Sequence, residues 1–351
     1  MPKKIREYGV AIGKLPVGRK NCITDVDGVK VGHITLDYPI DEEGTYACTG
    51  VTAILPHSGN LFKEKVTAAS YVINGFGKTT GLVQVNELGV LESPIMLTNT
   101  FGVPAVTQGT LDYMLEGNPE IGIVTGTINL VVGECNDSHL NSIRSCPVTP
   151  KHAIEAIHNA TEDVADEGAV GAGKGMICFG YKGGIGSSSR IVSDEKDNIS
   201  YTVGCLVLSN FGESYEFLSE KYKSIIVQNE STSKPTDGSI IIVFATDAPL
   251  SSRQLQRVIK RCGIGLGRTG SHYSHGSGDI VIGFSTAHKI PHSTENGTES
   301  RIQIREDHSI MNQLFTAAAE ATEEAIINSL SQAITTTGRN GHTVHSYQFE
   351  H

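Results

Sequence analysis

The most constraining feature of the sequence is a hydrophobic strand that begins directly after a polar stretch, at residues 235–250 (PTDGSIIIVFATDAPL). Ser239 opens a run of strand-forming residues from Ile240 to Phe244, whereas residues 229–238 (NESTSKPTDG) are typical of a linker. A β-branched run bounded by turn residues indicates a buried core strand. Ordinary turn chemistry explains a Gly–Ser step at such a boundary. A chain cut there, with Ser239 as a new N-terminus, is the alternative.

Size and composition limit the classes of protein to consider. The chain has 351 residues, of which 38% are hydrophobic and 19% charged, as in an ordinary globular protein of one large or two ordinary domains. A net charge of −10 disfavours a nucleic-acid partner. The longest apolar runs are far shorter than the roughly 20 residues that span a bilayer, so we expect no membrane partner. The charged start, MPKKIREYGVAIG, does not resemble a signal peptide and predicts a cytoplasmic protein.

Strand-like and helix-like segments alternate along the whole chain and predict a mixed α/β fold. The linker-like residues 224–238 lead straight into a core strand, which argues for a processing site inside one domain (1–351) rather than a domain boundary. Turn residues at DEKDN predict a hairpin over residues 188–209. The predicted strands are 51–57, 93–100, 121–133, 201–212 and the segment from Ile240, and the predicted helices are 104–117, 149–168, 245–263 and 309–334. We expect Thr149 to be the N-cap of the helix 149–168, and Asp247 or Ala248 to cap the helix 245–263, which Gly263 ends. In 309–334 the residues from Leu314 recur at helical spacing.

Three short motifs come close to ligand-binding patterns without matching them. GAVGAGKG (168–175) has Gly175 where a phosphate-binding loop needs Ser or Thr, and it follows a predicted helix instead of a strand. GLGRTG (265–270) also follows a predicted helix, whereas a dinucleotide-binding loop follows a strand. HYSHGSGD (272–279) lacks a convincing third metal ligand. Seven cysteines without a CxxC pair predict reduced thiols, so we expect no metal and no cofactor.

The Gly238–Ser239 step carries a possible chemistry of its own. A serine hydroxyl becomes a good nucleophile only when a base takes its proton. The α-amine of an N-terminal serine can be that base, because its pKa of about 7.7–8.0 leaves it partly neutral at physiological pH. Gly238 has no side chain to shield its carbonyl group. Ser239 Oγ could therefore attack that carbonyl group and cut the chain.

A series of sequence blocks follows in order along nearly the whole chain: NCITDVDGVKVGH (21–33), VVGECND (131–137), GKGMICFGYKGGIGSSSR (173–190), LVLSNFG (206–212), DGSIIIVFATDAPL (237–250), GRTGSHYSHGSGDIVIGFST (267–286) and AAEATEEAIINSL (318–330). Together these blocks resemble peptidase family S58, which includes the DmpA-type L-aminopeptidases/D-esterases and the β-aminopeptidases. Because the resemblance covers nearly the whole chain, it is far more specific than any single block.

This resemblance implies a four-layer α/β/β/α sandwich of the DmpA/ornithine-acetyltransferase type, with an N-terminal-nucleophile mechanism. It implies autocleavage between Gly238 and Ser239 into an α chain (1–238) and a β chain (239–351), with Ser239 as nucleophile. By the same resemblance, Asn210 helps to form the oxyanion hole. Ser277 and Asp279 orient the nucleophile, and Glu134 binds the substrate's ammonium group. Outside these blocks, each of the four would be read as a turn, capping or surface residue.

The resemblance implies release of N-terminal residues from short peptides, amino-acid amides or esters. It also implies a homo-oligomer of αβ units, which is a tetramer in the family. The chain departs from the family where Lys174 replaces a common Thr, with a role in the substrate pocket or in subunit contacts left open. It also has Asp279 where some members have Glu. Two alternatives remain: acyl transfer as in the ornithine acetyltransferases, which use Thr as nucleophile, and an unprocessed binding protein of the same fold.

Overall fold

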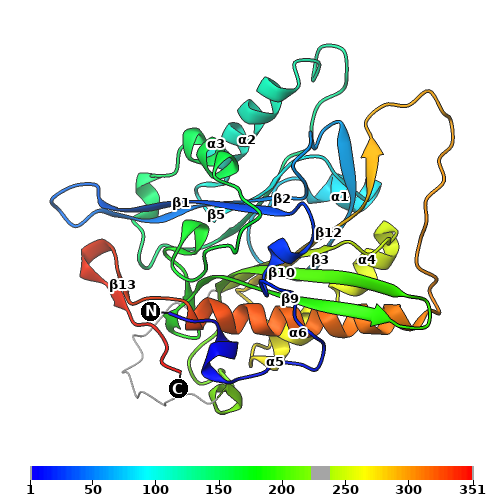
Figure 1. The fold of residues 1–351 in the computed structure, drawn as a ribbon. Coiled ribbons are helices and arrows are strands. Elements are labelled where there is room, and N and C mark those ends of the chain that lie inside the picture. Colours follow the sequence, from blue (N-terminus) through cyan, green and yellow to red (C-terminus); the bar gives the residue numbers. More distant parts are fainter. Residues whose placement is uncertain (1, 223–237, 350–351) are drawn as a thin grey trace.

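The computed structural model describes residues 2–222 and 238–349, and it has four layers (Figure 1). Two sheets lie face to face, and helices cover the outer face of each. The arrangement is the α/β/β/α sandwich that the resemblance implies. Of the linker-like segment 224–238, only Gly238 lies within the described residues.

The first sheet has the strand order β1-β2-β5-β6. Its strands pair antiparallel except for β5 and β6, which run parallel. The bounds are β1 (Lys30–Pro39), β2 (Tyr46–Leu55), β5 (Ile95–Asn99) and β6 (Val131–Cys135).

The second sheet has the order β4-β3-β12-β11-β10-β9. Only β11 and β12 pair in parallel. The bounds are β4 (Val90–Leu91), β3 (Glu64–Gly75), β12 (Gly278–Pro291), β11 (Ser239–Thr246), β10 (Ile199–Asn210) and β9 (Gly184–Asp194), and two short pairs complete the strands, β7 (Ile177–Cys178) with β8 (Tyr181–Lys182) and β13 (Thr336–Thr337) with β14 (Thr343–Val344).

The helices form the outer layers. α2 (Val103–Gly117) and α3 (Pro150–His158) cover the first sheet. α4 (Ser252–Ile259) and α6 (Ser309–Ser331) cover the second, and α5 (Cys262–Arg268) packs against α6. α1 (Leu82–Leu88) lies beside β3. No described helix combines the length and apolar character needed to cross a membrane. Short 3-10 turns are η1 (Ile5–Tyr8), η2 (Ile23–Asp25), η3 (Ile143–Ser145), η4 (Gly171–Gly173), η5 (Ser219–Tyr222) and η6 (Arg339–Gly341).

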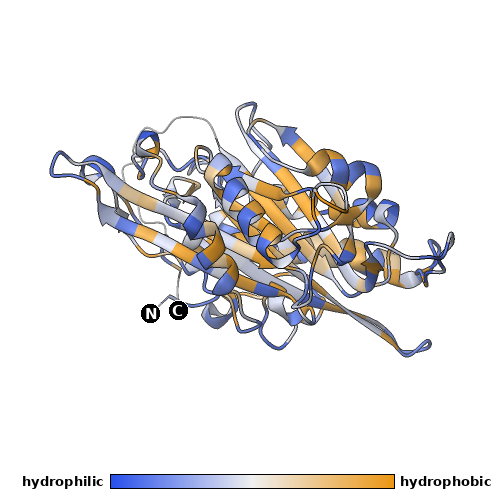
Figure 2. Cartoon of the chain, turned by 90° about the horizontal axis from the view of Figure 1, so that it is seen from above, coloured by the Kyte–Doolittle hydropathy of each residue, from blue (hydrophilic) through white to orange (hydrophobic). Residues whose placement is uncertain are grey.

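The position of β11 explains its uninterrupted apolar sequence. Ile240, Ile242 and Phe244 pack towards the helical layer, whereas Ile241 and Val243 pack between the two sheets. All eight residues of the strand are buried. Figure 2 shows hydrophobic residues concentrated along the central strands. Because successive side chains of a strand point to opposite faces, a strand with a hydrophobic layer on both sides has no polar alternation.

Most predicted elements are confirmed, but three extend differently. The predicted strand 121–133 is wrong over its first half. There Gly122 has φ 74°, and a tight turn leaves Ile123 and Val124 83% exposed, so only β6 forms. The predicted helix 149–168 begins at the expected N-cap Thr149 but ends at His158.

The predicted helix 245–263 is also wrong in its boundaries. β11 continues to Thr246, and the Asp247 carboxylate accepts a hydrogen bond from the Thr202 backbone N–H (2.7 Å) instead of capping a helix. The helix starts later, with Ser251 as its N-cap. Gly263, predicted to close this helix, falls within α5.

Candidate active site

Ser239 is the first residue of β11 and lies between two neighbouring strands. In the strand register it is opposite Asn210, the last residue of β10, and opposite Gly278, the first residue of β12. The ends of three strands therefore meet at this serine. Ser239 is 7% exposed, so its hydroxyl group is shielded without being sealed from solvent.

The Gly238 carbonyl oxygen, which belongs to the Gly238–Ser239 peptide bond, has two polar contacts. Ser239 Oγ lies 2.5 Å from it, and the Gly278 backbone N–H donates a hydrogen bond to it (3.1 Å). A side chain at position 238 would approach Phe211 Cα to 2.9 Å. Glycine therefore suits the tight backbone here. Donors aimed at this oxygen would stabilise negative charge that develops on it.

Asn210 is held in one orientation by both ends of its side-chain amide. Its Oδ1 accepts a hydrogen bond from the Ile177 backbone N–H (2.9 Å), and its Nδ2 donates to the Asn136 carbonyl oxygen (2.9 Å). A side-chain amide nitrogen carries two hydrogens, so Nδ2 keeps one for another acceptor. A buried, fixed donor opposite the serine suits an oxyanion hole.

Ser277 and Asp279 form a buried pair at the start of β12. Ser277 Oγ donates a hydrogen bond to Asp279 Oδ1 (2.7 Å), and Asp279 Oδ2 has no hydrogen-bond partner among the described residues. Burial raises the pKa of Asp279 to about 6, and the Ser277 hydrogen bond opposes this rise. A carboxyl group with a pKa near neutrality can exchange protons at physiological pH.

Glu134 lies on β6 of the opposite sheet, with its carboxylate held at both oxygens. The Lys78 backbone N–H donates to Oε1 (2.8 Å), and the Thr100 hydroxyl group donates to Oε2. Glu134 is 5% exposed. The described residues give it these two donors but no Lys or Arg ion pair, so its charge is available for a cationic ligand.

Two further residues support these groups, and the sequence did not indicate them. Thr100 follows β5 and contacts Glu134 from a neighbouring strand. Asn74 lies on β3 opposite Asp279, and its Nδ2 is within hydrogen-bonding distance of three carbonyl oxygens, those of Ser274 (3.1 Å), His275 (3.2 Å) and Ser277 (2.5 Å). Neither residue belongs to a quoted block. Asn74 is found only from the fold, because the fold brings β3 beside the loop before β12.

The motifs that come close to ligand-binding patterns have structural roles in the described part of the chain. The glycine-rich turn at 168–175 packs against backbone, and a side chain at Gly171 would lie 2.4 Å from Thr52 Oγ1. Lys174 forms an ion pair with Asp37 (2.7 Å). GLGRTG begins within α5. His272 lies 3.1 Å from Glu216 and not beside a metal-ligand set.

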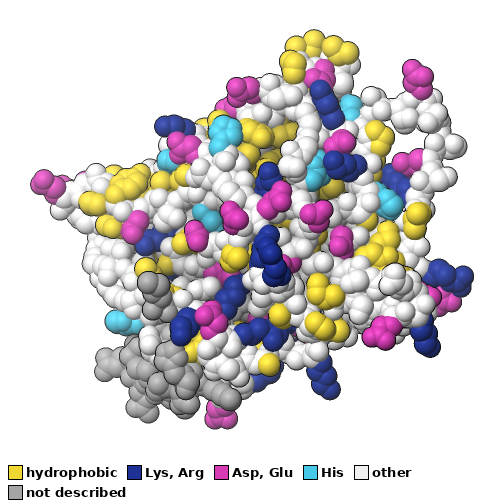
Figure 3. All heavy atoms as spheres, viewed as in Figure 1, with side chains coloured by type: hydrophobic (Ala, Val, Ile, Leu, Met, Phe, Trp, Pro, Cys, Tyr) yellow, Lys and Arg dark blue, Asp and Glu magenta, His cyan; other side chains and the backbone are white. Residues whose placement is uncertain are grey.

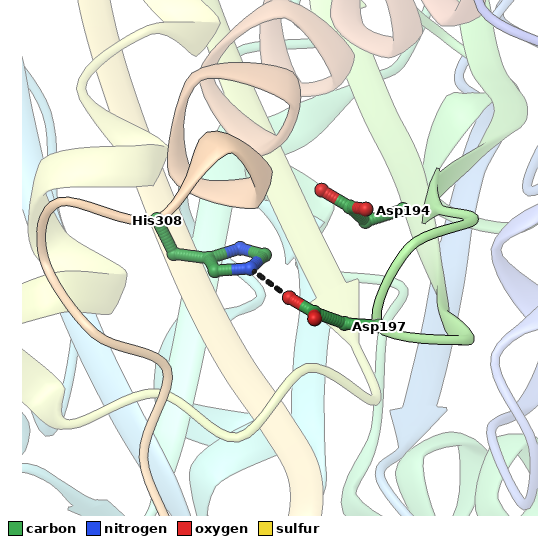
Figure 4. A group of neighbouring side chains, drawn as sticks. All are labelled: Asp194, Asp197 and His308. Atoms are coloured by element: carbon green, nitrogen blue, oxygen red, sulfur yellow. Dashed lines mark hydrogen bonds and ion pairs between the residues drawn. The ribbon is translucent and has the colours of Figure 1, made fainter.

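One group of side chains among the described residues has the spacing of metal ligands: Asp194, Asp197 and His308 (Figure 4). His308 Nε2 contacts Asp197 Oδ2 (2.7 Å), and the Ser309 hydroxyl group donates to Asp194 Oδ2 (2.6 Å). These contacts join the β9–β10 turn to the N-terminus of α6. Acidic groups near a helix N-terminus are stabilising, so the group serves the fold.

The cysteines confirm the prediction of reduced thiols. All seven cysteines are free thiols, and all but Cys146 are buried. Burial raises the pKa of Cys135 and Cys205 well above the ordinary value, so neither is a ready thiolate. On the face shown in Figure 3, basic and acidic side chains are interspersed.

Comparison with known proteins identifies the class. The solved structure of the L-aminopeptidase D-Ala-esterase/amidase of Ochrobactrum anthropi, a prototype of the serine aminopeptidases with a variant of the Ntn hydrolase fold, superposes with a TM-score of 0.87 at 31% identity, covering 98% of this chain and 95% of that one. The PH0078 protein of Pyrococcus horikoshii OT3 gives a TM-score of 0.89 at 48% identity, covering 98% and 96%. The fold is thus that of an Ntn-type hydrolase.

The sequence places the chain more narrowly. The model of peptidase family S58 matches residues 21–344. The β-peptidyl aminopeptidase BapA of Sphingosinicella microcystinivorans is 39% identical over 364 residues, covering 97% of this chain and 88% of that protein. The chain belongs to peptidase family S58 and is a hydrolase of the serine aminopeptidase type. This membership favours hydrolysis over the acyl-transfer alternative.

Proposed function

We propose that this protein is a self-processing aminopeptidase that releases N-terminal residues from short peptides, amino-acid amides or esters through an acyl-enzyme on Ser239. The observation that carries the proposal is the convergence at Ser239. The hydroxyl group sits beside the Gly238 carbonyl group at the head of a rigid strand, with the Asn210 amide directly opposite in the register.

Self-processing begins with the peptide bond between Gly238 and Ser239. Ser239 Oγ attacks the Gly238 carbonyl carbon, and the hydroxyl proton passes to the departing amide nitrogen. The product is an ester, and the Ser239 α-amine is free. Water then hydrolyses the ester and leaves a carboxylate on Gly238. The Gly278 N–H, which already donates to the Gly238 oxygen, stabilises the charge that forms there.

Turnover repeats this chemistry on a substrate. The freed amine of Ser239 takes the proton from its own Oγ as the hydroxyl group attacks the substrate carbonyl carbon. The second hydrogen of Asn210 Nδ2 stabilises the oxyanion, and one such donor is typically worth about 3–4 kcal/mol of barrier. The proton then goes to the leaving amine or alcohol, and water releases the acyl group. Ser277 and Asp279 hold and adjust the proton-bearing groups beside the nucleophile.

The substrate's free amino group gives the enzyme its preference for chain ends. Its positive charge needs a counter-charge when it leaves water. Glu134 supplies one, with Thr100 and the Lys78 backbone holding the carboxylate in place. The names of the relatives extend the substrate class of this proposal to peptides of β-amino acids.

The assembly and location follow from the family resemblance and the thiols. We place the mature enzyme in the cytoplasm, because seven free thiols suit a reducing compartment. We assign it a homo-oligomer of αβ units, a tetramer as in the family, formed from one domain cut into residues 1–238 and 239–351. Light scattering after gel filtration measures the assembly. A mass of a single αβ unit would contradict that part.

The deciding experiment is an intact-mass spectrum of purified protein with N-terminal sequencing of the smaller fragment. We expect a fragment that begins Ser-Ile-Ile-Ile, and an uncut, inactive chain for Ser239→Ala. The matched control is Ser277→Ala, which removes a neighbouring hydroxyl group and should slow processing without moving the cut. An uncut wild-type chain without amidase activity would favour the binding-protein alternative.

A further inference from the structure

An exposed aromatic side chain lies beside the buried machinery. Phe76 follows the end of β3 and is 49% exposed, although large apolar side chains are usually buried. Its backbone reaches the nucleophile: a methyl group placed on Gly278 would lie 2.0 Å from the Phe76 carbonyl oxygen and 3.2 Å from Ser239 Oγ. Phe76 therefore borders the point where a substrate's carbonyl group must sit.

The same segment reaches the Glu134 carboxylate within two residues. A side chain on Gly77 would lie 2.9 Å from Glu134 Oε1, and the Lys78 backbone N–H donates to that oxygen. Residues 76–78 thus run from the nucleophile to the carboxylate, along the path that the acyl part of a substrate takes. Gly77 leaves room above Glu134, and Phe76 stands at the other end of this path.

The Phe76 ring is turned towards the loop that leads into β12. It meets the His275 ring at a centroid distance of 6.3 Å and an interplanar angle of 59°. Asn74 Nδ2, 3.2 Å from the His275 carbonyl oxygen, anchors that loop. Two rings with a fixed backbone form a wall of the kind that holds an apolar or aromatic group.

We propose that Phe76 and His275 form the subsite for the leaving group, and that they favour substrates whose second residue or amine is aromatic. The proposal rests on the proposed function. An ammonium group at Glu134 and an acyl carbon at Ser239 fix two points of the substrate. The planar amide carries its leaving group on the side of the carbonyl carbon away from the ammonium group. The Phe76 and His275 rings lie at that end of the path.

The test compares substrates that share one acyl residue and differ in the leaving group. Alanyl-phenylalanine and alanyl-glycine form such a pair, with the β-alanyl pair run in parallel. Wild-type enzyme should have the higher kcat/KM on the phenylalanine member. Phe76→Ala should reduce that ratio roughly tenfold, because the stacking contact and its buried area are lost. Phe76→Tyr, which keeps the ring, should retain the ratio.

A second pair separates the two sides of the substrate. Alanine amide and leucine amide share the leaving group and differ in the acyl residue, and their ratio should stay constant in Phe76→Ala. The matched control is Tyr38→Ala, an aromatic residue of β1 that is 44% exposed and lies outside the site. It should alter neither ratio.

The other outcomes contradict the assignment of Phe76 to the leaving-group subsite. A change only in the acyl ratio would place Phe76 on the acyl side. Unchanged ratios together with a change in the assembly state, measured by light scattering, would make Phe76 a contact between copies of the chain. Inactivity of the wild-type enzyme on all six substrates would instead contradict the proposed function, so the two failures are distinguishable.

Discussion

Two buried charged groups on different strands of the second sheet differ in how their charge is balanced. Arg190 of β9 is fully buried, and its guanidinium group donates to the carboxylates of Glu320 and Glu324. Burial alone would raise the pKa of Glu324, yet the hydrogen bond from Arg6 and the charge of Arg190 lower it. Among the described residues, Asp279 of β12 has only the Ser277 hydroxyl group as a side-chain donor. Its pKa is raised to about 6 by burial.

This difference separates a structural charge from a chemical one. A buried charge with full partners gives a defined geometry and little reactivity, whereas an under-partnered carboxyl group costs stability and can exchange protons. The Arg190 cluster has a further consequence. Arg6 and Arg190 belong to residues 1–238, and Glu320 and Glu324 to residues 239–351, so these ion pairs would hold the two polypeptides together after cleavage.

The largest expected effect is on stability, from breaking the balanced cluster. Arg190→Met removes the buried cation that Glu320 and Glu324 share, although Glu324 keeps its ion pair with Arg6, and should lower the free energy of unfolding by about 3–5 kcal/mol. Urea unfolding of the uncut Ser239→Ala protein measures this. The matched control is Arg253→Met, which removes an exposed pair with Glu306 and should have a much smaller effect. Equal losses of unfolding free energy in the two variants would show that the buried pairs contribute no more than an exposed pair.

Asp279→Asn should instead raise the free energy of unfolding. The folded pKa of about 6 lies above the ordinary value of 3.8, so the stability contribution is complete below pH 4 and is lost as pH rises through 6. Asparagine does not titrate and avoids this loss. In the uncut Ser239→Ala protein, Asp279→Asn should therefore raise the free energy of unfolding by about 2 kcal/mol at pH 8 and leave it nearly unchanged at pH 4.

The same residue should govern the activity at acidic pH. If ionised Asp279 is required, kcat/KM rises with pH around an apparent pKa of about 6. Asp279→Asn should abolish most of the activity. Asp137 provides the control, because burial also raises its pKa, to about 7, although no part of the mechanism uses it. An acidic limb that disappears in Asp137→Asn, with activity otherwise retained, would assign the titration to Asp137.

Asn74 should show a smaller effect, confined to positioning. Asn74→Asp keeps the shape of the side chain but replaces the donor with an acceptor that faces three carbonyl oxygens, whereas Asn74→Ala only removes the contact. We expect kcat to fall in both variants, about tenfold in alanine and further in aspartate, since each buried hydrogen bond is worth roughly 1 kcal/mol. Aspartate performing as well as asparagine would show that the donor is unnecessary.

The sequence predicted the central fold and the candidate residues of the site where a local pattern carries them. The run from Ile240 indicated a buried core strand, and the helical spacing from Leu314 indicated α6. The β-branched run at 121–133 was misleading because a turn interrupts it at Gly122. Local patterns cannot show which distant backbone a polar side chain will meet.

The missed residues illustrate that limit. Asn74 bonds a loop about 200 positions away in the chain, and Arg190 meets carboxylates more than 100 positions away. In the sequence alone, a polar residue near a strand end is most simply explained as a turn or capping residue. Its distant partner becomes visible only in the folded sheet. The family blocks supplied the expected roles of Asn210, Ser277, Asp279 and Glu134, and the structure adds the contacts that support each side chain.

Thr100 offers the mildest and most selective perturbation, because it acts on a carboxylate that is neither balanced by a cation nor required to exchange protons. Thr100→Val keeps the shape but removes the hydroxyl group that donates to Glu134 Oε2. The carboxylate should lose orientation, and KM for amino-acid amides should rise about fivefold to tenfold with kcat nearly unchanged, equivalent to roughly 1 kcal/mol of binding.

Thr100→Ser, which retains the hydroxyl group, should restore KM. Propionamide, which lacks the ammonium group of alanine amide, should show no difference between the variants. A loss shared by both substrates would mean that Thr100 supports the backbone of the site and not the counter-charge for the substrate.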